Sequence, residues 1–249
     1  MPNKTKNQRA EFQTWSDLFK KARKRKDFCN VDEAIAAILK LWHTPVPTNS
    51  SRTSWRGKSG YRKNSKPSGV GKGEKNVEQR LLGPCGEIKE LSLQKGAKQI
   101  QIVSIYHNFP FANQKSGQVI SDCAGRICVG GRHRPLLMEV KVNANDPWFA
   151  LVECLQQVRL ARVPAGAQCI SDMLSERTPK AVCEEEVKEG AWGLVVTDSC
   201  SYFTKYPELQ EDCKKLLQSL KKETDARIGF AYLIEGNGLK LQWFDGNWS

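Results

Sequence analysis

The sequence contains no long apolar run, and no stretch approaches the roughly 18 residues that a membrane-spanning helix needs. Its first residues, MPNKTKNQRAEFQTW, lack the apolar segment of a secretory signal. Hydrophobic residues make up 39% of the chain, below the usual share for a compact globule, so part of the chain is expected to lie outside a core. We therefore expect an intracellular protein, cytoplasmic or otherwise, that is neither secreted nor inserted in a membrane.

Histidine is scarce, with three residues, and no Cys-x-x-Cys pair occurs, which argues against a structural zinc site. The nine cysteines are an odd number, and the disulfide frameworks of small secreted domains use even ones. We expect most of them to be reduced and half-buried, where they behave as small hydrophobic side chains.

Positive charge is concentrated in the N-terminal third. Residues 1–75 hold 18 Lys and Arg against 6 Asp and Glu, a net charge of +12, whereas residues 76–249 hold 21 of each sign. Such a basic segment is typical of proteins that bind nucleic acid or an anionic membrane surface, and a solubilising tail is the plain alternative. Neither helix expected there combines a basic face with a large apolar one, so we expect a nucleic-acid partner and no membrane.

The N-terminal third divides into two parts. Residues 1–43 are expected to form a basic helical hairpin, with Asn30 capping the second helix. The cluster Lys24, Arg25 and Lys26 is a candidate for phosphate contact, and an ordinary solvated helix face is the alternative. Residues 44–75, rich in Ser, Gly, Pro and cations, predict a flexible basic linker, because too few apolar residues are present to offset the entropy of ordering it.

Residues 76–249 have the pattern of a globular α/β domain. Strands are expected at 99–106, at QVISD and RICVG, at RPLLMEVKV, at 192–197 and in a C-terminal hairpin turning at GNG. Helices are expected from Pro147 and over 206–223, while 163–191 shows little periodicity. This order favours a mixed α/β sandwich built around one sheet.

The stretch LLMEVKV contains charges in an otherwise apolar strand. Successive side chains of a strand alternate between faces, so Glu139 and Lys141 project together while Met138, Val140 and Val142 point the other way. Asp122 precedes Glu139 by a hairpin, CAGRICVGGRHRPLLM, that can place the two carboxylates side by side. Two carboxylates suit Mg²⁺ or Mn²⁺, and the neighbouring ammonium can orient water or stabilise charge at phosphorus.

This arrangement resembles the PD-(D/E)XK, or restriction-endonuclease-like, nuclease superfamily, whose pattern is an Asp, a variable hairpin and Glu-x-Lys before a helix. The resemblance covers about residues 99–235. It implies an α/β fold with a restriction-endonuclease-like mixed sheet flanked by helices, and a Mg²⁺-dependent enzyme that hydrolyses phosphodiester bonds. The sequence does not distinguish DNA from RNA, and DNA is the substrate we expect. Asp122 and Glu139 would be metal ligands, with Lys141 at the attacking water.

The residues on either side distinguish the Glu-x-Lys pattern at Glu139 from the other copies of the pattern in the sequence. Glu-x-Lys also occurs at Glu87 and at Glu186, but only the copy at Glu139 is apolar on both sides and leads into a capped helix. Many relatives carry a Gln on this helix, which implies a site role for Gln157 or Gln156. The Tyr that often follows four residues later is absent, since position 161 is Ala161, and the alternative is an ordinary exposed polar residue.

Other candidates are weaker. A further acid often sits on a helix before the sheet, which makes Glu78 and Glu90 candidates, although a solvated helix face is the better interpretation of either. Hairpin cations are candidates for binding the nucleic-acid backbone, or else simple exposed charges: Arg126, Arg132, Arg134, with His133 beside them.

Two alternatives to an enzyme stay open. Glu139 and Lys141 would then be a charge pair in a structural sheet, with Asp122 as a turn former. The chain would in that case be a non-catalytic nucleic-acid-binding module on the same fold, or an interaction protein whose helical hairpin docks a partner. The oligomeric state is not predicted.

Overall fold

The structure is a computed structural model that describes residues 3–47, 73–81, 89–95, 98–110, 119–142, 146–177, 187, 190–236 and 238–244. The predicted linker, apart from its two ends, therefore lies outside the described residues. The helices are α1 Asn3–Ala22, the short 3-10 helix η1 Arg25–Asp27, α2 Val31–His43, α3 Glu74–Leu81, α4 Pro147–Ala161, α5 Pro164–Arg177, α7 Ser201–Thr204 and α8 Pro207–Glu223. The strands are β1 Lys89–Lys95, β2 Lys98–Pro110, β3 Ile120–Val129, β4 Arg132–Val140, β5 Trp192–Thr197, β6 Ile228–Leu233 and β7 Gly238–Phe244.

The strands form one closed barrel in the order β1-β2-β3-β4-β5-β6-β7. The pairs β1–β2, β2–β3, β3–β4 and β6–β7 are antiparallel. The pairs β4–β5, β5–β6 and β7–β1 are parallel. The expected restriction-endonuclease-like mixed sheet flanked by helices is therefore wrong for this chain, because that sheet is open and this one closes on itself.

Closure depends on β1, a strand that the sequence pattern did not predict. The side chains of Leu91 and Leu93 are buried in the barrel interior. Ser92, between them, pairs with Gly238 of β7. Only two apolar residues in KELSLQK give a weak alternating signal, and its partner on β7 is more than 140 residues away. The pairing of β1 with β7, which closes the sheet into a barrel, therefore could not be predicted from the local sequence pattern.

Strands β3 and β4 form a hairpin with a two-residue turn. Gly130 and Gly131 both have positive φ angles, 56° and 75°, as the turn between tightly paired twisted strands requires. The pairing runs from Val129 and Arg132 at the turn to Cys123 and Met138. The turn thus fixes which residue of β3 stands opposite each residue of β4.

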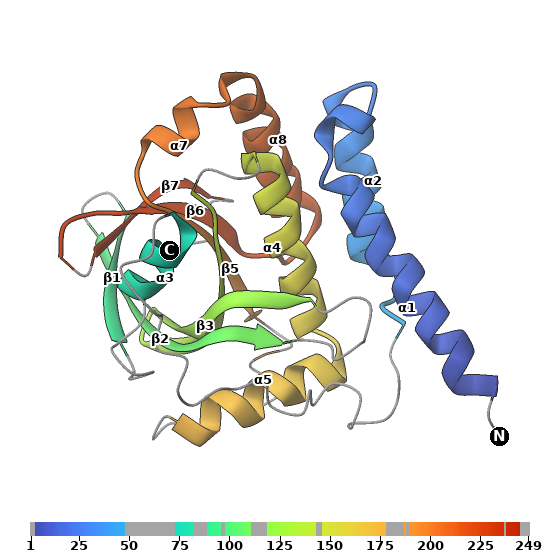
Figure 1. The fold of residues 1–249 in the computed structure, drawn as a ribbon, viewed down its shortest axis with the longest axis horizontal. Helices are drawn as coiled ribbons and strands as arrows, with labels where there is room; N and C mark the ends of the chain where they lie inside the picture. Colours follow the sequence, from blue (N-terminus) through green and yellow to red (C-terminus); the bar gives the residue numbers. More distant parts are fainter. Residues whose placement is uncertain are drawn as a thin grey trace.

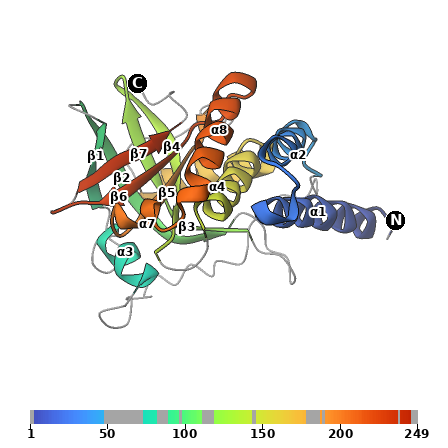
Figure 2. The ribbon, with the colours of Figure 1, turned by 90° about the horizontal axis from the view of Figure 1, so that it is seen from above.

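The two faces of the barrel strands pack into different cores. The interior is filled by apolar side chains from all seven strands and is joined by α3. The outer face around β4 and β5 is covered by α4, and α8, α1 and α2 complete a helical layer on that side, as Figures 1 and 2 show. Helices α1 and α2 contact α4 and α8, so the basic N-terminal segment packs on this layer.

Helices α2 and α4 both begin at a capping residue, where the sequence pattern predicts the start of a helix. The Asn30 side chain accepts a hydrogen bond from the Glu33 N–H at the start of α2, and the Glu33 carboxylate accepts one from the Cys29 N–H. Asp146 caps α4 by accepting from the Phe149 N–H, and the helix begins at Pro147, as predicted. Helix α5 was missed, since 164–177 lacks a clear apolar stripe.

Among the helices that the structure describes, none is both long and apolar enough to cross a membrane.

Candidate active site

Asp122, Glu139 and Lys141 meet on the outer face of the barrel. Because Cys123 pairs with Met138, the preceding Asp122 stands beside Glu139 on the neighbouring strand, and Asp122 Oδ2 accepts a 2.7 Å hydrogen bond from the Val140 N–H. Lys141 follows β4, where its N–H donates to the Val196 carbonyl, and its Nζ lies 2.6 Å from Glu139 Oε1. Met138, Val140 and Val142 point into the barrel, so the predicted division of faces is confirmed.

Gln157 lies over this group from α4. Its Nε2 donates a 2.5 Å hydrogen bond to Glu139 Oε2, the carboxylate oxygen that Lys141 does not contact. Its neighbour Gln156 turns toward α1, where its Nε2 donates to Ser16 Oγ at 3.2 Å. Of the two glutamines, Gln157 is the one that the fold brings to Glu139.

Two further residues complete the network, and sequence reasoning missed both. Glu153 of α4 places Oε2 3.2 Å from Lys141 Nζ, and its Oε1 accepts a 2.7 Å hydrogen bond from Arg23 Nη1. Glu153 and Gln157 are four residues apart and share one helix face. This spacing was the available signal for Glu153, whereas nothing in the local sequence connects Arg23 to a residue 130 positions later.

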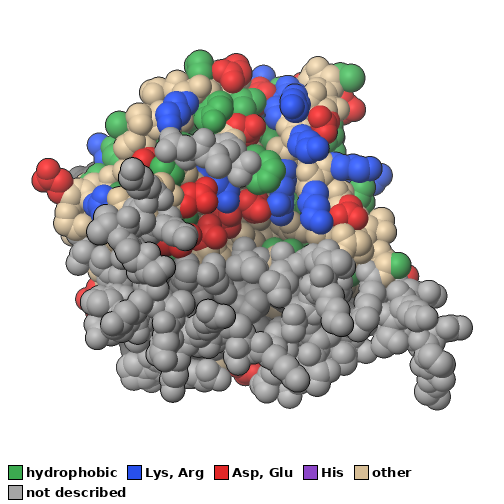
Figure 3. Space-filling view, in the orientation of Figure 1, with side chains coloured by type: hydrophobic (Ala, Val, Ile, Leu, Met, Phe, Trp, Pro, Cys, Tyr) green, Lys and Arg blue, Asp and Glu red, His purple; other side chains and the backbone are tan. Residues whose placement is uncertain are grey.

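Glu78 of α3 belongs to the same electrostatic environment. Burial raises the pKa of Asp122 to about 6, and the charges of Glu78 and Glu153 add to this rise, while the Val140 hydrogen bond and Lys141 oppose it. Glu78 lies partly exposed on α3, and its charge still acts on Asp122. Figure 3 shows acidic side chains gathered near the middle of one face, with Lys and Arg side chains toward α1 and α2.

Negative charge exceeds positive charge in this group. Burial raises the pKa of Glu139 well above its ordinary value, and Asp122 and Glu153 raise it further, against the effect of Lys141. Burial alone would lower the pKa of Lys141, but Glu139 and Glu153 more than offset it, so the net pKa is raised and the ammonium stays charged. A bound cation would relieve this excess of carboxylates.

The described residues contain no group of three or more His, Cys, Asp or Glu side chains placed to hold a metal ion. Asp122 and Glu139 supply two carboxylates. Mg²⁺ commonly uses one or two carboxylates and completes its shell with water and substrate phosphate oxygens. The donor set therefore fits Mg²⁺ or Mn²⁺ held jointly with a phosphate, and it does not fit an all-protein cage.

The predicted nucleic-acid contacts lie in two places. Lys24 and Lys26 are exposed beside α1, whereas Arg25 is bound to Asp212 of α8 at 2.6 Å and lies over the Trp148 ring. Arg132 is exposed and Arg134 partly buried near the β3–β4 turn, with Arg126 buried on β3. Arg132 is seven residues from Glu139 along β4, roughly 23 Å, so this cation is not brought to the carboxylates.

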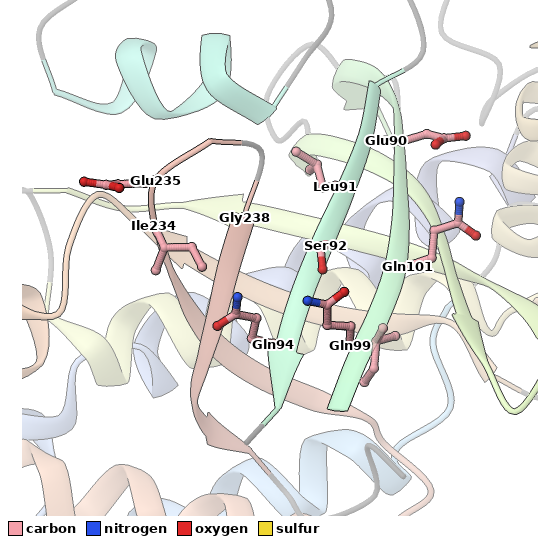
Figure 4. Close-up of a pocket in the computed structure, with 10 residues that line it drawn as sticks. Glu90, Leu91, Ser92, Gln94, Gln99, Gln101, Ile234, Glu235 and Gly238 are labelled. Atoms are coloured by element: carbon pink, nitrogen blue, oxygen red, sulfur yellow. The ribbon is translucent and has the colours of Figure 1, made fainter. Parts of the chain in front are cut away.

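Glu90 is separate from this group. It lines an open groove of about 600 Å³ formed by β1, β2 and the segment that leads into β7 (Figure 4). Gln94, Gln99 and Gln101 line the same groove, and Asp122, Glu139 and Lys141 do not. Of the two other Glu-x-Lys copies, Glu87, Glu186 and Lys188 lie outside the described residues.

No family model, curated protein or solved structure matches the chain. What the site can do is therefore inferred from its geometry and chemistry alone.

Proposed function

We propose that this protein is a metal-dependent nuclease that hydrolyses phosphodiester bonds, with DNA as its substrate. The observation that carries the proposal is the convergence of Asp122, Glu139 and Lys141 on one outer face of the barrel, with Lys141 Nζ 2.6 Å from Glu139. These are the residues that resemble the PD-(D/E)XK pattern. The excess of carboxylates around them supports a role for a divalent cation.

Each side chain has a definable part in such a reaction. Asp122 and Glu139 would hold Mg²⁺ or Mn²⁺, which when bound polarises a phosphate oxygen and lowers the pKa of water. Lys141, kept charged by its carboxylate neighbours, would orient the attacking water and stabilise negative charge at phosphorus. Gln157 fixes the orientation of Glu139 through its second oxygen.

The basic N-terminal segment would supply affinity for the phosphate backbone. It carries the whole net charge of +12, and Lys24 and Lys26 are exposed beside α1. Such contacts are independent of sequence and weaken as salt rises, because binding releases counterions from the nucleic acid.

One observation favours a second candidate, a non-catalytic nucleic-acid-binding module. Glu139 is only 3% exposed, and both of its carboxylate oxygens already accept hydrogen bonds from Lys141 and Gln157. A carboxylate whose two oxygens are already bonded can serve the fold alone. Dependence of cleavage on metal separates the two candidates.

The experiment is cleavage of labelled duplex DNA, single-stranded DNA and RNA with Mg²⁺, Mn²⁺ or EDTA. Wild type is compared with Glu139→Gln, which keeps the shape of the side chain and removes its charge. Glu223→Gln, at an exposed position near the end of α8, is the matched control. We expect metal-dependent cleavage that Glu139→Gln reduces at least a thousandfold, about 4 kcal/mol of transition-state stabilisation, and that Glu223→Gln leaves unchanged.

Two results would decide against the nuclease. If wild type binds DNA in a salt-sensitive manner but cuts none of the three substrates with either metal, the binding module is the better description. If cleavage survives Glu139→Gln in a protein free of contaminating nuclease, the activity resides elsewhere in the chain.

A further inference from the structure

Arg23, immediately after α1, reaches into the candidate active site. Its Nη1 donates to Glu153 Oε1 at 2.7 Å, and its Nη2 donates to Gln156 Oε1. The guanidinium also lies over the Phe149 ring, 5.4 Å from the ring centre. The side chain is 12% exposed, so it is largely enclosed between α1 and α4.

The fold fixes the backbone around Arg23. Trp148 Nε1 donates a 2.9 Å hydrogen bond to the Ala22 carbonyl at the end of α1, and Arg25 binds Asp212 of α8 at 2.6 Å. One turn earlier, Phe19 is fully buried in the helical layer. The guanidinium of Arg23 is therefore held against α4 because residues before and after Arg23 in the chain are bound to the helical layer.

Glu153 is shared between two cations. One oxygen accepts from Arg23 and the other lies 3.2 Å from Lys141 Nζ, which also contacts Glu139 at 2.6 Å. Without Arg23, the Glu153 carboxylate can turn both oxygens to Lys141 and compete with Glu139 for the ammonium. Loss of the guanidinium also removes one positive charge from a group that already has an excess of carboxylates.

We propose that Arg23 is a positioning residue for the reaction, which holds Glu153 so that the Lys141 ammonium stays beside Glu139. The proposal rests on the proposed nuclease function. It makes the N-terminal helical segment part of the active site as well as a source of nucleic-acid affinity. Arg23 itself does not touch the reacting atoms, since it acts through Glu153.

The test compares steady-state cleavage by wild type, Arg23→Met and Arg23→Lys. We expect Arg23→Met to lower kcat by about tenfold to a hundredfold, as loss of residues that orient metal-site ligands does. KM should change by less than about threefold, because the enclosed side chain offers no contact to substrate. A fall in kcat at constant KM is the result expected of a positioning residue, since loss of a substrate contact would raise KM.

Arg23→Lys and Asp212→Asn separate positioning from a purely structural role. Arg23→Lys keeps the charge beside Glu153, so kcat should recover, but only in part because one ammonium cannot reach both Glu153 and Gln156. Asp212→Asn breaks a pair of similar burial that anchors the same segment to α8. It should lower the melting temperature and leave kcat unchanged at a temperature where the variant is folded.

The outcomes distinguish this inference from the proposed function. If wild type does not cleave, both are overturned together. If wild type cleaves and Arg23→Met retains the wild-type kcat, the nuclease stands and the role of Arg23 is rejected. If Arg23→Met and Asp212→Asn lower kcat alike, Arg23 acts only through stability and the inference is again rejected.

Discussion

Replacing Asp122 by Asn should stabilise the protein at neutral pH while it removes activity. Burial, together with Glu78 and Glu153, raises the pKa of Asp122 from its ordinary value of 3.8 to about 6. At about 1.4 kcal/mol for each pH unit, keeping this carboxylate ionised in the folded protein costs about 3 kcal/mol. Asp122 is partly exposed, and water screens it, so we expect Asp122→Asn to raise the free energy of unfolding by about 1 to 3 kcal/mol.

The sign of the effect depends on pH. Since the pKa in the folded protein lies above the ordinary value, the folded state binds the proton more tightly than the unfolded state does. The stability that this provides is fully present below about pH 4 and is lost as pH rises to about 6 and beyond. The advantage of Asp122→Asn should therefore vanish below about pH 4 and reach its full size near pH 7.

The assay is urea unfolding of both proteins, without divalent metal, at pH 4 and pH 7.5. The amide oxygen of Asn can still accept the hydrogen bond from the Val140 N–H, so the substitution changes mainly the charge. Asp198→Asn, at an exposed residue just after β5, is the control and should alter stability by less than about 0.5 kcal/mol.

A less stable Asp122→Asn at pH 7.5 would refute the reasoning. It would show that the charged form of Asp122 is well satisfied in the fold, as a structural residue would be. A stability difference independent of pH would likewise show that the carboxylate titrates normally.

Two further predictions concern the same region. Mg²⁺ should raise the melting temperature of wild type at pH 7.5 but not at pH 4, because protonated carboxylates bind the ion poorly; differential scanning fluorimetry with Asp122→Asn as the non-binding control checks this. Phe19→Ala should lower the free energy of unfolding by about 3 to 5 kcal/mol, because the ring is fully buried where α1 packs in the helical layer. An effect below about 1 kcal/mol in urea unfolding would show that α1 does not pack there.

Much of the candidate site could be predicted from the sequence because its signals are local. Alternation along LLMEVKV fixes which side chains share a face, and the short hairpin before it brings Asp122 alongside Glu139. The cap at Asp146 and Pro147 likewise marks the start of α4, which sets the position of Gln157 above Glu139.

The missing parts depend on contacts between distant segments. Strand β1 has a weak pattern of its own and becomes a barrel strand only through its pairing with β2 and β7. The contact of Arg23 with Glu153 joins the residue after α1 to α4, far away in the sequence, and each residue alone has the pattern of an ordinary exposed polar side chain. Sequence periodicity reports local burial, and it does not report which distant surfaces meet.

The register of β4 determines both the packing of the barrel interior and the position of the charged side chains of the site. The same strand contributes Met138 and Val140 to the barrel interior and Glu139, with Lys141 just beyond it, to the outer face. Deleting one residue between the Gly130–Gly131 turn and Glu139 would exchange the two faces, turning the charges inward and the apolar side chains outward. An insertion or deletion near β4 therefore preserves both the barrel interior and the site only if it lies within the turn or changes the strand by an even number of residues.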